Sequence, residues 1–266
     1  MATNLSERDL RALLRVADDG RQDEPTDAMP WAALDALRAL VPCDSMVFKE
    51  LDVTSEQVPV FQTLADGGRR LELDGEGDSR ENDGFWQLRR EFLPCNYPDR
   101  TGDLNSITLW SDFYTARDLR NAPMFAEIYG PQGHRFSLLV SLPAPFGQTR
   151  RMQIWRDGGR DFDERDRLVL QLIRPHLHEI YLDAKRRRAG IPRLTRRELD
   201  VLRLVAEGLG NADIARRLFI SVGTVRKHLE HIFDRTGART RVKAVALVLP
   251  HLVLDPANDG GGDPDR

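Results

Sequence analysis

The feature that most constrains how this chain folds is a run of four basic residues that leads into glycine and proline. Residues 185–192 read Lys-Arg-Arg-Arg-Ala-Gly-Ile-Pro. Because Pro192 disfavours helical backbone at Ile191, a helix that arrives from the N-terminal side is expected to end there. We therefore predict a basic linker at residues 185–192, which joins an N-terminal domain, residues 1–184, to a C-terminal domain, residues 193–254.

The two parts carry opposite charge. Residues 1–184 contain 22 Lys and Arg against 32 Asp and Glu, whereas residues 185–254 contain 16 against 6. The formal net charge of -3 hides this division. Such asymmetry indicates a nucleic-acid-binding part joined to another part, although a basic segment can also be an ordinary solvated surface. Residues 255–266 are acidic and lack large apolar side chains, so we predict a disordered tail there.

Composition excludes several classes of protein. None of the apolar runs in the 266 residues approaches the roughly 18 residues that span a bilayer, and the first residues show no basic and then apolar leader pattern. Two cysteines, Cys43 and Cys95, are too few for a disulfide framework or a four-ligand zinc site, which favours a reducing compartment. We expect a cytoplasmic protein with no membrane partner.

The C-terminal part reads as four short helices, each with residues that mark its ends. Thr195 and Glu198 form a T-x-x-E capping box, whose side chains satisfy free amides at a helix start. Leu199, Leu202 and Val205 then repeat at helical spacing. The other predicted boundaries are Gly208 and Gly210 at the end of the first helix, Asn211 as the N-cap of the second, the turn Phe219-Ile220, Ser221 as the N-cap of the third, Gly237 at its end, and a fourth helix over residues 241–249 that stops at Pro250.

The second and third of these helices, residues 211–218 and 221–236, are joined by a turn of a few residues. With small Ala215 where they cross and Val225 packing back, they have helix-turn-helix geometry. This geometry presents the start of the third helix to a DNA major groove about 12 Å wide. The residues thus predict a DNA-binding unit. A helical bundle whose polar residues have no role, or an adaptor that binds proteins, stays open as an alternative.

A longer pattern at fixed spacing runs through the same part of the chain. It comprises LTRRE at 194–198, Val201-Leu202, Gly208, Asn211, Ile214-Ala215, Leu218, Ser221, Thr224-Val225, His228, Ile232, Gly237 and Arg241. On this pattern residues 194–247 resemble the LuxR-type, or GerE-like, helix-turn-helix domain of bacterial transcription regulators. The resemblance implies that the third helix is the recognition helix, with Arg226, Lys227 and Glu230 facing DNA, and that the fourth helix pairs two domains.

Two residues depart from the family pattern. Glu230 stands where a basic or polar residue is frequent, and its carboxylate can accept a hydrogen bond from cytosine N4. Thr236 stands where Leu is usual, and we expect it to loosen the end of the third helix. The candidate DNA-binding residues are Thr195, Arg196, Ser221, Thr224, Arg226, Lys227, His228, Glu230 and His231. The candidate dimer contacts are Val242, Val245, Ala246 and Leu249.

The N-terminal part is predicted to be an α+β domain. Apolar residues at helical spacing predict helices over residues 5–17 and 31–41, and an acidic cap at residues 163–166 predicts the start of a long helix. A polar, Gly-rich interval lies between residues 64 and 106. Short apolar stretches predict strands over residues 45–51, 58–64, 106–110, 136–142 and 152–155. Strands paired as one sheet with helices before and after them give a layered α+β arrangement.

Residues 161–177, which read DFDERDRLVLQLIRPHL, follow a predicted strand and turn. This signature is similar to the GAF-like sensor domains that precede LuxR-type units, which implies a GAF-like α+β domain ahead of an all-α, four-helix LuxR-type domain. The acidic pair of a receiver domain and the Walker phosphate loop are not found. Of the Trp, Tyr and Asp-Pro pattern of acyl-homoserine-lactone binding domains, Tyr97-Pro98-Asp99 is at most a fragment.

Thiols and aromatic residues of the N-terminal part are candidates for a redox pair and for a small-molecule pocket. Cys43 and Cys95 form a redox pair only if they meet in space, and two ordinary thiols are favoured. Pockets for small molecules are mainly apolar, yet aromatic residues of a small domain usually form its core. The candidate ligand-pocket residues are Trp86, Tyr97, Trp110 and Phe113.

The histidines are interpreted as structural. His176 and His178 point about 200° apart on a helix, so they do not share one metal ion. His134 is interpreted as a strand-edge residue, because the sequence shows no nucleophile with an oriented partner. We therefore predict no metal and no cofactor.

Together these patterns predict a bacterial transcription regulator that is not an enzyme. Its expected partner is a double-stranded DNA operator, bound as a homodimer on a pseudo-palindrome and controlled by the N-terminal domain. RNA polymerase and a small-molecule effector are further candidate partners. The rival class, a GAF-like or hydrolase-like enzyme, lacks a readable nucleophile, metal set or phosphate loop.

Overall fold

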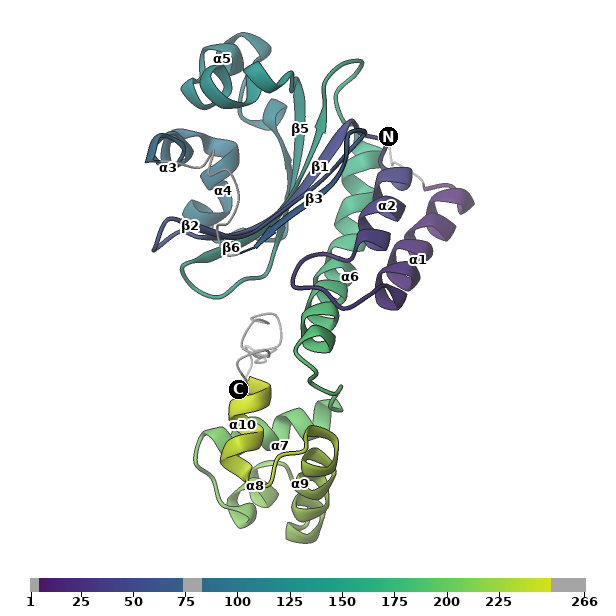
Figure 1. Cartoon of the computed structure of the whole chain (residues 1–266), viewed down its shortest axis with the longest axis vertical. Helices are drawn as coiled ribbons and strands as arrows, with labels where there is room; N and C mark the ends of the chain where they lie inside the picture. Colours follow the sequence, from purple (N-terminus) through teal and green to yellow (C-terminus); the bar gives the residue numbers. More distant parts are fainter. Residues whose placement is uncertain (1–4, 74–82, 250–266) are drawn as a thin grey trace, which may run out of the picture. The chain divides into compact units, whose positions relative to one another are not determined.

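The computed structural model describes residues 5–73 and 83–249. The chain divides into two compact units, Met1–Ala184 and Lys185–Arg266. Figure 1 shows a sheet with helices in the first unit and helices alone in the second.

The N-terminal unit is built on an antiparallel sheet, whose described strands have the order β3-β2-β1-β6-β5-β4. At its centre Lys49 lies opposite Arg151. The strands are β1 Ser45–Asp52, β2 Gln57–Ala65, β3 Gly68–Leu73, β4 Ile107–Leu109, β5 Phe136–Leu142 and β6 Gln148–Arg156. Strands β1, β2, β4 and β5 are confirmed with small differences at their ends, and β6 is confirmed but begins four residues before its predicted start. Strand β3 was not predicted.

Strand β3 lies in the interval that the sequence presents as polar and Gly-rich. It pairs with β2 at the edge of the sheet, and its first four residues are exposed. Leu71 and Leu73 are its only apolar side chains, so the alternation is too short to predict a strand. The same interval holds helices α3 Asp83–Glu91 and α4 Leu93–Thr101, which were also not predicted. Pro98 lies inside α4, where a proline argues against a helix, whereas Pro94 lies in the first turn, where proline is tolerated.

Successive residues of a strand face opposite sides of the sheet, and each side has its own core. On β1, Met46 and Phe48 belong to the first core. Figure 1 shows α1 Glu7–Gln22, α2 Trp31–Leu40 and α6 Glu164–Arg188 on this side. These helices and the α+β fold class are as predicted.

The second core lies on the other side of the sheet, where Val47 and Leu51 of β1 point. Figure 1 shows α3, α4 and α5 on this side. Helix α5, Ala116–Asn121, is a short element that the sequence did not predict. Buried aromatic side chains from this layer, among them Phe92 and Trp110, fill the second core.

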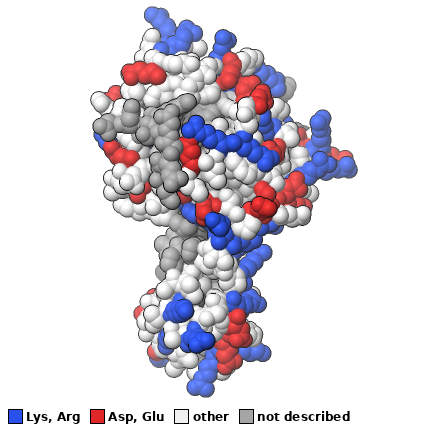
Figure 2. Space-filling view, viewed as in Figure 1, with Lys and Arg blue, Asp and Glu red and all other residues white. Residues whose placement is uncertain are grey.

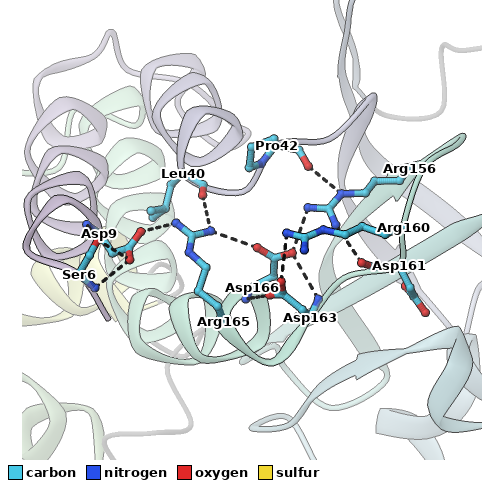
Figure 3. A network of polar contacts seen from close by, with 10 residues as sticks. All are labelled: Ser6, Asp9, Leu40, Pro42, Arg156, Arg160, Asp161, Asp163, Arg165 and Asp166. Atoms are coloured by element: carbon cyan, nitrogen blue, oxygen red, sulfur yellow. Dashed lines mark hydrogen bonds and ion pairs between the residues drawn. The ribbon is translucent and has the colours of Figure 1, made fainter. Parts of the chain in front are cut away.

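The start of α6 is held by a network of polar contacts, drawn in Figure 3. Asp163 accepts a hydrogen bond from the Asp166 backbone amide at 3.0 Å, which confirms the predicted acidic cap. Asp166 in turn accepts from Arg156 on β6 at 3.0 Å. Arg165 donates to the carbonyl of Leu40 at 3.0 Å, at the end of α2, and to the carboxylate of Asp9 on α1. The network therefore joins α1, α2, β6 and α6.

Helix α6 ends as the glycine and proline predict. Gly190 has a left-handed φ of 68°, and the amide of Ile191 donates to the carbonyl of Arg186 at 3.0 Å. The basic residues 185–188, placed in a linker on sequence grounds, form the last turn of this helix. Only the residues after Arg188 connect the helix to the C-terminal helices.

The C-terminal unit has the predicted helical construction. Its helices are α7 Arg196–Ala206, α8 Asn211–Arg217, α9 Val222–Thr236 and α10 Arg241–Val248. Their buried faces meet in one core, with Val201, Ile214, Val225, Ile232 and Ala244 fully buried. The four predicted helices are confirmed.

Two predicted details of these helices are wrong. Gly210, rather than Asn211, is the N-cap of α8, and Asn211 is the first helical residue. Thr236 does not leave the end of α9 loose. Its hydroxyl donates to the carbonyl of Ile232 at 2.6 Å and accepts from the amide of Ala238 at 3.3 Å, so it helps to close the helix.

Candidate nucleic-acid interface

Helix α9 has one face in the core and one face in solvent. Val225, Leu229 and Ile232 are buried. Arg226 and Lys227 lie on the exposed side with Glu230, one turn further along. The packing therefore fixes the helix while leaving two cationic side chains of its first turns free to contact a ligand.

The start of α9 is capped by Ser221, as predicted. Its hydroxyl accepts from the amide of Thr224 at 3.0 Å and lies 2.8 Å from the Thr224 hydroxyl. Amides of the first helical turn point out of the helix start, which gives this end a partial positive charge. The cap thus places a favourable site for an anion beside Arg226 and Lys227.

The turn before Ser221 presents an aromatic side chain to solvent. Phe219 has a left-handed φ of 53°, and it is 95% exposed. The amide of Ile220 donates to the carbonyl of Ala215 at 3.0 Å, which closes the end of α8. The sequence predicted this turn but not the exposure of Phe219. Ile220, the next residue of the same turn, packs against the core, so a place in the turn did not by itself predict which of the two side chains would be exposed.

The start of α7 is fixed against α9 by one buried carboxylate. Glu198 is 2% exposed and accepts from the amide of Thr195 at 2.7 Å, while the Thr195 hydroxyl accepts from the Glu198 amide at 3.3 Å. The predicted capping box is therefore confirmed. The same carboxylate accepts from Arg235 on α9 at 3.0 Å, and its other oxygen lies 3.9 Å from Nδ1 of His231.

The candidate residues consequently fall into two groups. The first group lies at the start of α9 and comprises the N-cap Ser221 with Thr224, Arg226, Lys227 and His228 of the first two turns. His231 lies about ten residues beyond Ser221, or roughly 15 Å along the helix. Through its contact with His231, Glu198 brings the start of α7, with exposed Thr195 and Arg196, close to that histidine. Glu230 lies between the two groups.

Arginines of this unit that the sequence did not single out hold its helices together. Arg197 donates to the carbonyl of Leu218 at 2.5 Å, at the end of α8. Arg235 donates to the carbonyl of Arg193 at 3.1 Å as well as to Glu198. Part of the positive charge counted from the sequence is therefore structural. On the face shown in Figure 2, Lys and Arg side chains spread over the C-terminal unit with a group of acidic side chains among them.

The predicted dimer contacts differ in exposure. Val242 is 73% exposed and Ala246 is also exposed, whereas Val245 and Leu249 are half-buried. Leu247, which was not predicted, is 38% exposed on the same helix. Helix α10 thus presents apolar side chains to solvent.

The predicted pocket residues lie in the second core of the N-terminal unit or at its margin. Trp86 and Trp110 are buried, and the ring of Trp110 lies 5.2 Å from that of Tyr129. Tyr97 and Phe113 are half-buried with their rings 5.4 Å apart. These side chains pack against other aromatic rings, and their role as a pocket stays a prediction.

The cysteines and His134, which were considered as candidate chemical groups, pack against other residues of the N-terminal unit. Both cysteines are free; Cys43 packs against the first core and Cys95 lies in the second, so the sheet separates them. Burial raises the pKa of the Cys43 thiol to about 12. His134 stacks on Trp155 at 4.4 Å and lies 2.8 Å from Asp157. Among the described residues, none of the helices is long and apolar enough to cross a membrane.

Comparison with known proteins places the C-terminal unit. The family described as "Bacterial regulatory proteins, luxR family" matches residues 192–248. An HTH-type transcriptional regulator of Mycobacterium bovis is 49% identical over 63 residues, which are 24% of this chain and 7% of that protein. The chain therefore corresponds to a small fraction of this relative's length.

Two solved structures resemble the chain at low similarity. Escherichia coli SdiA has a TM-score of 0.40 and 16% identity, covering 93% of this chain and 98% of its own. The phycoerythrobilin-bound GAF domain of a cyanobacterial phytochrome has a TM-score of 0.43 and 13% identity, covering 68% and 97%. Likenesses at this level assign no ligand and no function to the N-terminal unit. The family match and the helix geometry agree for the other unit: residues 192–248 form a helix-turn-helix domain of the bacterial regulatory LuxR family.

Proposed function

We propose that this protein is a DNA-binding transcription regulator that inserts the start of α9 into the major groove. The observation that carries this proposal is the exposed face of α9. Arg226 and Lys227 project from the first turns beside the Ser221 cap, while Val225 and Leu229 anchor the opposite face. A helix held in this way presents side chains to base edges without itself being deformed.

We assign each candidate residue a DNA contact according to the chemistry of its side chain. Arg226 and Lys227 contact base edges or phosphates, and the amides near Ser221 and Thr224 receive a phosphate oxygen. Glu230 accepts from cytosine N4, which makes it a determinant of sequence rather than of affinity. Thr195, Arg196 and His231, together with His228, contact the backbone of the flanking DNA.

Direct binding of duplex DNA tests this proposal. The full chain is used to select sequences from a random duplex library, and binding to the selected duplex is followed by fluorescence anisotropy at several salt concentrations. We expect affinity to fall linearly in the logarithm of salt concentration, because phosphate contacts release counterions. Failure to bind any duplex at low salt contradicts the proposal and favours the alternative, a protein-binding adaptor. The observation that favours this alternative is the exposed aromatic side chain of Phe219, which a protein partner could cover.

We propose further that the protein acts as a homodimer through α10. Val242, Ala246 and Leu247 give that helix an exposed apolar surface, which pairing of two copies would cover together with the margins of Val245 and Leu249. Two-fold symmetry would place two copies of α9 about one duplex turn apart, as a pseudo-palindromic operator requires.

Sedimentation velocity checks this dimer. Val242→Asp should shift the full chain towards the monomer, whereas Phe146→Asp, at a fully exposed loop residue outside the proposed surface, should not. Equal behaviour of the two variants and the parent chain would place the dimer contact elsewhere or exclude it.

The proposed control of DNA binding runs through α6. This helix is a central part of the first core, with Ile173, Leu177 and Ile180 buried, and it continues to Arg188, just before the C-terminal helices. A ligand-dependent shift of α6 would therefore reach the connection to the DNA-binding unit. A small-molecule effector and RNA polymerase remain candidate partners of this regulator. A cytoplasmic location fits this role. We propose no enzymatic activity.

A further inference from the structure

The second core of the N-terminal unit contains two buried arginines that the proposed function does not use. Arg151 lies on the central strand β6 and Arg89 on α3, and each is 2% exposed. Arg151 lies opposite Lys49, on the same face of the sheet as Val47 and Leu51 of the second core. Arg89 belongs to α3, whose Phe85 and Trp86 also lie in that core. A buried guanidinium normally needs a full set of acceptors, because removal of a charge from water is costly.

The two guanidinium groups share one carboxylate. Arg89 forms an ion pair with Asp99 of α4, and Nη2 of Arg151 lies 3.9 Å from the same carboxylate oxygen. Arg151 otherwise donates to two neutral groups, the carbonyl of Cys95 at 2.7 Å and the hydroxyl of Thr149 at 2.8 Å. Two positive charges therefore face one negative charge within this cluster.

Both arginines also carry a donor without an acceptor. Among the described residues, Nε of Arg89 and Nε of Arg151 are buried and have no hydrogen-bond partner. Burial and the charge of Arg89 lower the pKa of Arg151, although a guanidinium stays protonated in a protein. Unsatisfied buried donors are rare in native proteins, and a pair of them on neighbouring cations is typical of a site that binds an anion.

Two acceptors in the same layer lack donors. Oδ1 of Asn96, the residue after Cys95, is buried without a partner among the described residues, and so is Oε1 of Gln153. Gln153 lies two residues from Arg151 on β6, so both side chains leave the same face of the sheet, about 7 Å apart along the strand. Aromatic surface is also present, since the Arg89 guanidinium lies over the ring of Trp86 at 5.7 Å.

We infer that the N-terminal unit binds a small monocarboxylic acid, whose carboxylate lies between Arg89 and Arg151. One negative charge neutralises the excess of the Arg89, Arg151 and Asp99 cluster, whereas a phosphate dianion would overcompensate it. A hydroxyl or amine elsewhere on the ligand donates to Asn96 or Gln153. This site concerns the N-terminal unit alone, so it stands or falls independently of DNA binding.

The probe for this site is 4-hydroxybenzoate, which offers one carboxylate, an aromatic ring and a hydroxyl donor. Isothermal titration calorimetry of the full chain, at constant ionic strength and neutral pH, should show saturable binding of one molecule per chain. Arg89→Met and Arg151→Met should each weaken it at least tenfold. Arg100→Met, an exposed arginine next to Asp99, is the matched control and should leave it unchanged.

Asp99→Asn gives the sharper readout. Removal of the competing carboxylate raises the local charge by one, so 4-hydroxybenzoate should bind about tenfold more tightly. A purely structural role of the arginines would not produce this gain, and the variant keeps the measurement decisive if Arg151→Met fails to fold. Absence of saturable binding to the parent chain, or unchanged or weaker binding to Asp99→Asn, overturns the inference.

Discussion

Glu198 and Arg235 lie 37 residues apart in the chain, and their side chains meet at 3.0 Å where α7 begins beside α9. The same carboxylate closes the capping box with the Thr195 amide at 2.7 Å. One buried side chain therefore both starts a helix and fixes that helix against the candidate recognition helix. Replacing it should disturb the position of α9 as well as the start of α7.

Glu198→Ala should lower the free energy of unfolding of the C-terminal unit by about 2 kcal/mol, because it removes the cap and leaves Arg235 and the Thr195 amide without this acceptor. Glu198→Gln keeps an acceptor for the amide and should cost about 1 kcal/mol. Urea denaturation followed by circular dichroism measures both. Equal losses for the two variants would show that the charge, rather than the capping hydrogen bond, matters.

The helices of the C-terminal unit were predictable because their signals are local. Thr195, Ser221 and Gly237 each act within a few residues of themselves, so sequence spacing alone marks the ends of α7 and α9. Asn211 failed as a predicted cap because Gly210 is also acceptable there, and spacing does not choose between them.

The less predictable parts depend on contacts between distant residues. Arg165 pairs with Asp9, 156 residues away, and the local sequence around either residue does not predict this contact. Strand β3 has a short apolar pattern, and its pairing with the distant residues of β2 defines it as a strand. The site shows the same limit: the exposed side chains of α9 follow from helical periodicity, whereas the position of Thr195 and Arg196 beside His231 depends on Glu198.

Gly20 should be irreplaceable where α1 meets its neighbours. A Cβ atom at this position would lie 2.9 Å from Ala33 on α2 and 2.9 Å from Ile180 on α6. Gly20→Ala should therefore destabilise the N-terminal unit by about 1 to 3 kcal/mol, despite the better helix propensity of alanine. Thermal unfolding measures this loss. Gly158→Ala, where a Cβ atom meets nothing within 4 Å, is the control, and a similar loss there would refute the packing explanation.

The Asp9–Arg165 pair should make stability depend on pH in the acid range. Hydrogen bonds from Arg165 and Ser6 lower the pKa of Asp9 from 3.8 to about 2. Because the folded state lowers this pKa, the contribution is fully present above about pH 4 and is lost as pH falls towards 2. Asp9→Asn should cost about 1 to 2 kcal/mol at neutral pH.

Urea titrations of the parent chain and Asp9→Asn at several pH values measure this dependence. The difference between the two proteins should shrink as pH falls from 4 to 2. Asp18→Asn, at an exposed residue of the same helix, controls for the change in net charge. A difference that stays constant over this range would mean that Asp9 acts through its shape and not through its charge.

Lys227 tests whether the exposed face of α9 reads sequence. Lys227→Ala should weaken binding to the selected duplex by about 1 to 3 kcal/mol and should have less effect on an unrelated duplex, because a base contact contributes only to the cognate sequence. A phosphate contact would instead weaken both duplexes alike and reduce the salt dependence by about one counterion. Lys243→Ala, an exposed lysine on α10, is the matched control. Anisotropy titrations with both duplexes at three salt concentrations separate these outcomes, and unchanged affinity in every titration would remove Lys227 from the interface.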